Sequence, residues 1–345
     1  MKNFSKIKPR IGITIGDPAG IGPEIILRAI IDEEVLDCAS PIIIGDAQHL
    51  SHHARKLDLI CGLDIYNAGE ELPETLNAPI LYNVKNLSAT VEMGKESPEY
   101  GQAAGQYVEA AVELIKSGQI DAMTNGPISK RALQLGGYPY PGHSEMLGYL
   151  TNVKDYAMAF VSSSLRVVLL TTHLPLAKAL TYVKKERVER TIRLVDRELR
   201  RWGIKRPRIA VAAVNPHGAE GGLFGIEEAS ELIPAIEVCN RDPEFDIRGP
   251  FSADTVFLRA ARGEFDVVLS CYHDQGMIPV KCLSFGEAVN VTLGLPFIRT
   301  AVDHGTAFDI AGKGQADPRS MVEAIKLAAQ LTLSSSESEG DPIRI

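Results

Sequence analysis

Short apolar runs rich in isoleucine and valine recur along the chain and predict buried β-strands. The runs are continuous rather than alternating, as expected for strands that helices cover on both faces. The six runs are IGITI (11–15), PIIIG (41–45), RVVLL (166–170), IAVAAV (209–214), DVVLS (266–270) and VNVTL (289–293).

Three segments between or after these runs have the apolar periodicity of amphipathic helices. Their apolar faces are Ala104, Val108, Ala111, Val112 and Ile115, ending at Gly118; Val188, Ile192, Val195, Leu199 and Trp202; and Met321, Val322, Ile325 and Ala329. Strands and helices therefore alternate, which predicts an α/β protein with three layers, α/β/α. The polar end LSSSESEGDPIRI, residues 333–345, predicts a frayed tail.

Length and composition indicate an ordinary globular protein without a nucleic-acid partner. The 345 residues suffice for two α/β units, and no clear repeat or linker is visible. Hydrophobic residues make up 45% and charged residues 23%, which argues against disorder. The net charge of -8 argues against binding a phosphate backbone, although a local anion pocket is compatible with it.

The cysteines and the N-terminal segment favour a cytoplasmic protein. Five cysteines are an odd number, and no two have the CxxC spacing of a thiolate metal site. The apolar stretch after the basic N-terminus is too short for a signal peptide. No run of about 20 apolar residues, the length that spans a membrane, occurs.

Three of the predicted strands lead into a histidine: VVLLTTH at His173, IAVAAVNPH at His217 and DVVLSCYH at His273. Ligands of open α/β sheets bind beyond the carboxyl ends of strands, so the three imidazoles can converge there. Three histidines with an open position form a catalytic metal site. The alternative is that each is a loop residue with one hydrogen bond. A neighbouring acid such as Asp274 can orient a metal-bound imidazole, or it is simply solvated.

Two further segments have both a functional and a structural interpretation. GDPAGIGPE, residues 16–24, can present backbone N–H groups to an anion, or it is a structural turn between a strand and a helix that starts near Pro23. In YPGHSEMLGYL, Ser144 is either an N-cap or, with His143, part of a donor pair for an anionic substrate. Lys281 and Arg299 adjoin apolar runs, so each needs a structural carboxylate or a substrate anion.

Taken together, the motifs make the chain resemble the 4-hydroxythreonine-4-phosphate dehydrogenase family, which includes relatives that oxidise 4-phospho-D-threonate and 4-phospho-D-erythronate. The resemblance covers roughly residues 10 to 333. It rests on GDPAGIGPE, GHSE, TTHLPL, NPHGAEGG, GPFSADTVF, YHDQG and GLPFIRTAVDHGTAFDIAGKGQAD, in that order.

The resemblance implies a fold like that of isocitrate and isopropylmalate dehydrogenases, with two subdomains around a cleft. The first subdomain, with the NAD loop, is expected at 1–128 plus 283–345, and the second, with the metal ligands and the dimer interface, at 129–282. NAD or NADP binds without a GxGxxG fingerprint, and HGTAFDIAGKGQADP resembles the adenosine-side loop, which points to His304 and Asp309.

The resemblance also implies the site residues and the partners. A divalent cation (Zn, Co or Mg) is held by His173, His217 and His273, the last from the neighbouring subunit of a homodimer. The substrate contacts fall on His143, Ser144, Lys281, Asn290 and Arg299.

The implied activity is NAD-dependent oxidation and decarboxylation of a 4-phosphorylated 3-hydroxy acid. The expected reaction converts 4-phosphohydroxy-L-threonine into 3-amino-2-oxopropyl phosphate in pyridoxal phosphate biosynthesis. Alternatives are a catabolic 4-phospho-D-threonate or 4-phospho-D-erythronate dehydrogenase, a cyclic dihydrodiol carboxylate dehydrogenase, or a binding module without turnover. GHSE in place of GHTE, and the order Gly-Ala after His217, depart from the familiar pattern. The general base is not identified, and Asp254 and Asp274 are candidates.

Overall fold

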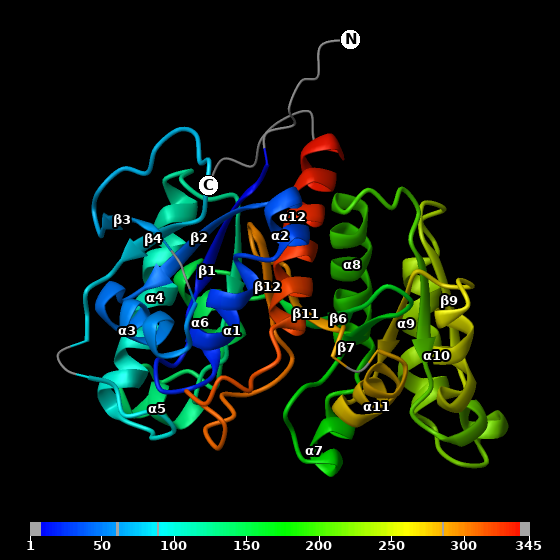
Figure 1. The fold of residues 1–345 in the computed structure, drawn as a ribbon. Helices are drawn as coiled ribbons and strands as arrows, with labels where there is room; N and C mark the ends of the chain where they lie inside the picture. The colour runs from blue at the N-terminus through cyan, green and yellow to red at the C-terminus, as the bar shows by residue number, and fades with distance from the viewer. Residues whose placement is uncertain (1–7, 60–61, 88–89, 285, 339–345) are drawn as a thin grey trace, which may run out of the picture. The chain divides into compact units, whose positions relative to one another are not determined.

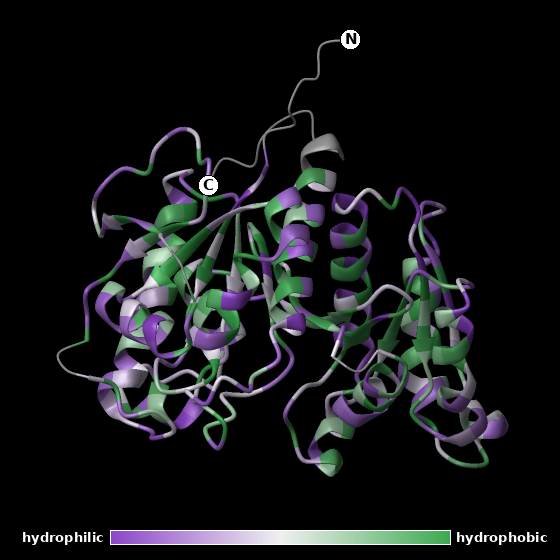
Figure 2. Ribbon diagram, in the orientation of Figure 1, coloured by the Kyte–Doolittle hydropathy of each residue, from purple (hydrophilic) through white to green (hydrophobic). Residues whose placement is uncertain are grey.

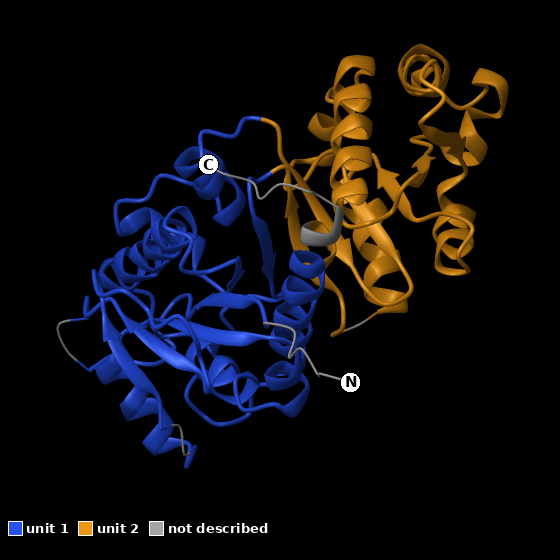
Figure 3. Ribbon diagram, turned by 90° about the horizontal axis from the view of Figure 1, so that it is seen from above, with its two compact units in different colours: residues 1–154, 295–333, 343–345 blue, residues 155–294, 334–342 orange. Residues whose placement is uncertain are grey.

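A computed structural model describes residues 8–59, 62–87, 90–284 and 286–338 (Figure 1). The chain forms two compact units (Figure 3). Of the described residues, unit 1 comprises those within 8–154 and 295–333, and unit 2 comprises those within 155–294 and 334–338. Each unit is a β-sheet region covered by helices, so the predicted α/β class is confirmed.

Unit 1 contains six parallel strands in the order β3-β4-β2-β1-β5-β12. Their bounds are β1 Arg10–Thr14, β2 Ser40–Gly45, β3 Asp64–Asn67, β4 Ile80–Asn83, β5 Ala122–Asn125 and β12 Ile298–Ala301. The helices are α1 Gly22–Ala29, α2 Glu33–Cys38, α3 Ala47–Lys56, α4 Pro98–Lys116, α5 Lys130–Leu135 and α6 His143–Leu150, and α12 Arg319–Ser338 begins in this unit. Parallel pairing places the carboxyl ends of all six strands at one edge.

Unit 2 contains strands in the order β11-β6-β7-β10-β8-β9. The pairs β11/β6 and β6/β7 are antiparallel, and β7/β10, β10/β8 and β8/β9 are parallel. The strands are β6 Ala157–Val161, β7 Arg166–Leu169, β8 Arg208–Ala212, β9 Asp246–Phe251, β10 Val267–Ser270 and β11 Val289–Leu293. The helices are α7 Leu176–Thr181, α8 Lys185–Arg201, α9 Ile233–Cys239, α10 Ala253–Ala261 and α11 His273–Leu283, with a short 3₁₀ segment Pro216–Gly222 and a π-helical turn Glu228–Leu232.

All six apolar runs form strands as predicted, and their residues make up much of the core (Figure 2). The predicted helical faces are also confirmed: on α8, Val188, Ile192 and Val195 are fully buried. The other six strands, which are β3, β4, β5, β6, β9 and β12, were not predicted. Most of them are only four residues long and lack a run of branched apolar residues, so local sequence gives little signal for them.

The C-terminal prediction was wrong in part. Residues 333–338 continue α12 instead of fraying, and residues 339–345 lie outside the described part of the chain. Once the buried face of α12 has formed, each added residue gains a backbone hydrogen bond at little entropic cost, and serine is only a moderately poor helix former. A polar composition alone therefore did not end the helix.

Candidate active site

The three predicted metal-binding histidines follow three neighbouring parallel strands of unit 2. His173 follows β7, His273 opens α11 after β10, and His217 follows β8. Because β10 pairs with both β7 and β8 in parallel, the three strand ends lie at the same edge of the sheet. This is the edge at which open α/β sheets bind ligands.

Two of the three imidazoles lie together. The ring centroids of His173 and His273 are 5.3 Å apart, with an interplanar angle of 40°. His273 Nδ1 pairs with Asp274 Oδ1 at 2.7 Å. This hydrogen bond fixes one ring nitrogen, so Nε2 of His273 is the nitrogen that can bind a ligand or an ion.

His217 has a different environment. Its ring lies 6.4 Å from that of Phe224, centroid to centroid. It opens a run of five residues, His217 to Gly221, that all have left-handed backbone angles, with φ between +45° and +68°. Such angles are costly for residues other than glycine, and accumulated strain of this kind is typical of functional loops.

The described residues offer a partial fit to a metal ion. Imidazole nitrogens bind zinc at about 2.0–2.1 Å. The rings of His173 and His273 are close enough for both to reach one ion. Within the described part of this chain, however, no group of three or more His, Cys, Asp or Glu side chains is arranged to hold a metal. A complete site therefore needs at least one further ligand.

A second polar cluster lies at the strand ends of unit 1. Arg299 of β12 is 3% exposed, and its Nε donates to Asn125 Oδ1 at 2.7 Å. Asn125 Nδ2 in turn donates to Thr14 Oγ1 at 2.9 Å. Burial lowers the pKa of Arg299 to about 9, opposed by the negative charge of Glu145, so the guanidinium stays charged at neutral pH.

His143 at the start of α6 belongs to the same cluster. Burial, together with the positive charges of Arg299 and Lys130, holds the pKa of His143 well below its usual range, so its imidazole is neutral. Its Nε2 is buried without a hydrogen-bond partner among the described residues. Ser144 is buried beside it. The N-cap of α6 is Gly142, so the capping interpretation of Ser144 is wrong.

The remaining predicted site residues lie in several places. Lys281 is in α11 and Asn290 is in β11, both in unit 2. Asp254 is exposed at the start of α10, and the side chain of Asp274 is 77% exposed. His304 and Asp309 lie in the segment between β12 and α12, where His304 Nδ1 is 3.1 Å from the carbonyl oxygen of Gly305.

The GDPAGIGPE segment holds the loop that contains His304 and Asp309. The N–H of Ile21 donates to Thr306 O at 3.0 Å, and the buried carboxylate of Glu24 accepts from the N–H groups of Gly314 (3.2 Å) and Ala316 (2.9 Å). The N–H groups of Asp17, Ala19 and Gly20 also donate within the protein. These bonds favour the structural interpretation of the turn over an anion site.

Asp17, in the same turn, is a buried carboxyl group with a raised pKa. It is 1% exposed, and its Oδ2 has no hydrogen-bond partner among the described residues. Burial raises the pKa of Asp17 to about 6, and the N–H of Ala19 partly opposes the shift. The sequence showed Asp17 only as part of a turn motif, since neither its burial nor its charge state is visible from residue types.

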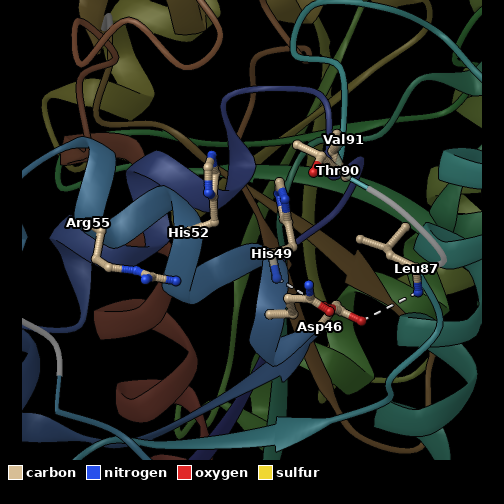
Figure 4. A pocket seen from close by; sticks show the side chains of 8 residues that line it. Asp46, His49, His52, Arg55, Leu87, Thr90 and Val91 are labelled. Atoms are coloured by element: carbon tan, nitrogen blue, oxygen red, sulfur yellow. Dashed lines mark hydrogen bonds between the residues drawn. The ribbon is translucent and has the colours of Figure 1, made fainter.

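A separate pocket of about 100 Å³ lies in unit 1, between α3 and the residues Leu87, Thr90 and Val91 (Figure 4). His49 lines it, and burial lowers the pKa of His49 to about 4. No residue predicted from the sequence as a site residue lines this pocket; its lining residues are Asp46, Gln48, His49, His52, Arg55, Leu87, Thr90 and Val91. None of the helices in the described ranges is long and apolar enough to span a membrane.

Comparison with known proteins gives consistent matches over most of the chain. Residues 37–328 match the family described as pyridoxal phosphate biosynthetic protein PdxA. The chain is 44% identical over 329 residues to the D-threonate 4-phosphate dehydrogenase of Cupriavidus necator, covering 95% of this chain and 98% of that protein. It is also 44% identical over 325 residues to the 4-hydroxythreonine-4-phosphate dehydrogenase of Desulfosudis oleivorans, covering 93% and 95%. The crystal structure of 4-hydroxythreonine-4-phosphate dehydrogenase from Klebsiella pneumoniae is similar with a TM-score of 0.82 at 39% identity, covering 94% of this chain and 100% of that one.

Proposed function

The chain belongs to the family of the pyridoxal phosphate biosynthetic protein PdxA, and from this premise we propose that it is an NAD-dependent and metal-dependent dehydrogenase. Its substrate is a 4-phosphorylated 3-hydroxy acid, which it oxidises and decarboxylates. The observation that carries the proposal is the position of His173, His217 and His273, which follow three neighbouring parallel strands at the ligand-binding edge of unit 2.

Two substrates are candidates. The first is 4-phosphohydroxy-L-threonine, which gives 3-amino-2-oxopropyl phosphate in pyridoxal phosphate biosynthesis; the relative from Desulfosudis oleivorans carries that name. The second is 4-phospho-D-threonate, favoured by the equally similar D-threonate 4-phosphate dehydrogenase from Cupriavidus necator, and its analogue 4-phospho-D-erythronate is grouped with it on chemical similarity alone. Both classes carry a phosphate and a carboxylate, so the same charged side chains serve either.

Charged and polar side chains hold the two anionic ends of the substrate. We assign this role to His143, Ser144, Lys281, Asn290 and Arg299. The buried, charged Arg299 supports it, since its Nε is already fixed by Asn125 and the guanidinium fork is thereby oriented before the substrate binds. The neutral His143 beside it adds a hydrogen-bonding group without further repulsion between cations.

His173, His217 and His273 hold the divalent cation, which we propose to be Zn, Co or Mg. When bound, such a cation supplies Lewis-acid chemistry that lowers the pKa of the substrate hydroxyl. The hydrogen bond from His273 Nδ1 to Asp274 fixes the ring orientation and leaves Nε2 as the nitrogen that can bind the cation. NAD, when bound, would supply the hydride acceptor, and oxidation of the substrate hydroxyl would give a β-keto acid that can lose carbon dioxide.

The same site is proposed to be completed by a second copy of the chain, which donates His273. Large exposed apolar side chains support this, because the described ones lie mainly in unit 2 although it is the smaller unit. Those of unit 2 are Leu176, Leu180, Tyr182, Leu223, Phe224, Ile226, Ile233, Leu258, Ile278 and Leu283, against Ile31, Ile65, Leu135 and Tyr149 in unit 1. A cytoplasmic location is proposed as well; Cys38, Cys239, Cys271 and Cys282 are free thiols.

The decisive experiment is a substrate screen. Purified protein with NAD or NADP and a divalent cation is assayed for reduced cofactor with 4-phosphohydroxy-L-threonine, 4-phospho-D-threonate and 4-phospho-D-erythronate. One of them is expected to be turned over with a clear preference. Turnover of none, with intact folded protein that binds the cofactor, would reject the proposed reaction.

Removal of the metal tests its role separately. Dialysis against a chelator should abolish turnover, and added Zn, Co or Mg should restore it. Undiminished activity of metal-free protein would contradict the metal requirement and leave the dehydrogenase assignment standing.

Mixed dimers test the origin of His273. His173→Ala and His273→Ala homodimers should each be inactive. Hybrid dimers should regain up to half of the wild-type activity, because one of their two sites then has all three histidines. Well-formed hybrids without activity would place all ligands in one chain, in keeping with the 5.3 Å between the His173 and His273 rings.

A further inference from the structure

A single buried glutamine joins the ends of two strands that lead to the imidazoles of unit 2. Gln275, in the first turn of α11, is 8% exposed. Its Oε1 accepts from the N–H of Cys271 at 2.7 Å, and its Nε2 donates to Ala213 O at 2.6 Å. Cys271 directly follows β10 and Ala213 directly follows β8, so one side chain bridges both strand ends.

Two further buried side chains secure the neighbouring backbone. Thr171, two residues before His173, donates its Oγ1 to Cys271 O at 2.9 Å. Glu228 accepts from the N–H groups of Val214 and Asn215, each at 2.8 Å, and Nδ2 of Asn215 also donates to it. All three segments that lead to His173, His217 and His273 are therefore held by buried hydrogen bonds.

The packing of α11 explains why a glutamine reaches both strands. At the next residue, Gly276, a Cβ would lie 2.6 Å from Ser270 Oγ and 2.7 Å from Leu169 Cδ2, closer than real Cβ atoms come. The glycine therefore lets α11 lie directly against β7 and β10. At that short distance the amide of Gln275 reaches the backbone of two strand ends.

We propose that Gln275 is a positioning residue for the metal site. By pairing with Cys271 and Ala213, it fixes the backbone from which His273 and His217 extend, so that each imidazole reaches its metal site, its own or the partner's. The inference rests on the proposed function, in which these histidines bind a cation. Residues that hold the ligands of a metal typically change its affinity about 10-fold to 100-fold when substituted.

Gln275→Met tests the proposal, because methionine has a similar shape but cannot make either hydrogen bond. A matched control is Asn240→Leu in the same unit. Asn240 makes the same kind of amide pair with one backbone residue: its Nδ2 donates to Ile247 O at 2.7 Å, and its Oδ1 accepts from Ile247 N at 3.1 Å. Ile247 lies at the start of β9, at the opposite end of that strand from the imidazole edge.

The measurement is the dissociation constant of Co²⁺ for full-length, metal-free protein, together with the visible ligand-field spectrum of the complex. Gln275→Met is expected to bind Co²⁺ about 10-fold to 100-fold more weakly, with a changed spectrum. Asn240→Leu should match the wild type in both. A general loss of stability would affect both variants and would not alter the spectrum selectively.

Each outcome separates the two proposals. If the wild type binds no Co²⁺, the metal function and this inference both fail. If it does, and Gln275→Met retains the wild-type affinity and spectrum, only the positioning role is overturned. Should Gln275→Met not fold, as judged by circular dichroism, Gln275→Asn keeps the neutral amide but is one methylene too short to bond both Cys271 and Ala213. It is expected to weaken Co²⁺ binding about threefold to tenfold, and unchanged binding would overturn the proposal.

Discussion

Units 1 and 2 both have polar side chains at the carboxyl ends of parallel strands, but these side chains differ in their exposure to solvent. In unit 1, Arg299 and Asp17 are almost completely buried. In unit 2, His173 and His217 are exposed and His273 is half-buried, near large apolar side chains that are also exposed. Unit 1 thus buries its charged side chains among internal hydrogen bonds, whereas unit 2 leaves its strand-end histidines at the surface.

The same contrast appears in the backbone around the two clusters. Close packing shapes the unit 1 turn: a Cβ on Gly16 would lie 2.3 Å from Pro127 O. In unit 2, the loop from His217 to Gly221 is left-handed throughout, and at Gly221 no atom lies within 4 Å of an added Cβ. The cluster in unit 1 is therefore held in place by buried charge and close contacts. The cluster in unit 2 is held by its backbone conformation and by the buried hydrogen bonds of Gln275, Thr171 and Glu228.

The largest effect is expected for Arg299→Met in unit 1. In the proposed role, removing this buried charge from its anionic substrate group costs about 2–5 kcal/mol, which lowers kcat/KM by about 30-fold or more at constant cofactor concentration. Initial rates of NADH formation measure it. Arg131→Met is the control, because Arg131 is in unit 1 with a side chain that is 79% exposed. A loss below tenfold would show that the buried guanidinium does not hold the substrate.

The second effect is a pH dependence of stability caused by Asp17. Its folded pKa of about 6 lies above the ordinary 3.8, so the folded state binds more protons between these values, and the free energy of unfolding falls as pH rises from 3.8 to 6. Asp17→Asn cannot ionise and escapes this loss. The free energy of unfolding of the variant, relative to that of the wild type, should rise by on the order of 3 kcal/mol between pH 4 and pH 7, measured by urea unfolding. An equal difference at both pH values would contradict the raised pKa.

A third, smaller effect concerns the packing beneath the imidazoles of unit 2. Gly276→Ala forces a methyl group against Ser270 and Leu169, so α11 must move away from the sheet. Overpacking of this kind typically costs about 1–3 kcal/mol in the free energy of unfolding. Urea unfolding at pH 7 measures it. A change below about 0.5 kcal/mol would mean that α11 adjusts freely and that its closeness is not needed.

The smallest effect is expected in the left-handed loop. Gly221→Ala meets no atom, so only the backbone conformation at φ +68° opposes it. The left-handed conformation costs alanine about 1–2 kcal/mol, partly offset by the lower entropy of its unfolded chain, which leaves a net loss of about 0.5–1 kcal/mol. Glu220→Gly, at φ +45°, should change stability in the opposite direction. Two changes of the same sign, measured by thermal unfolding, would contradict a strained loop.

Much of the fold was predictable because buried parallel strands and amphipathic helices leave strong local patterns. The runs that form β1, β2, β7, β8, β10 and β11 are all visible in the sequence. β5 and β12 were missed although they carry Asn125 and Arg299, since AMTN and IRTA are only four residues long and each contains two adjacent polar residues. The C-terminal helix was cut short for a related reason, because serine content does not determine where a helix with a buried face ends.

The sequence alone determined the α/β class, the family and the residue types at the strand ends, because strand burial and motif order are local properties of the chain. Only the tertiary structure decided that Arg299 pairs with Asn125, that His173 and His273 meet, and that Gln275 joins two strands. The hydrogen bond between Gln275 and Ala213 links residues 62 positions apart in the chain, and the one between Arg299 and Asn125 links residues 174 positions apart. Such distances close only when the order and register of the strands are set, which is a property of packing rather than of any local pattern.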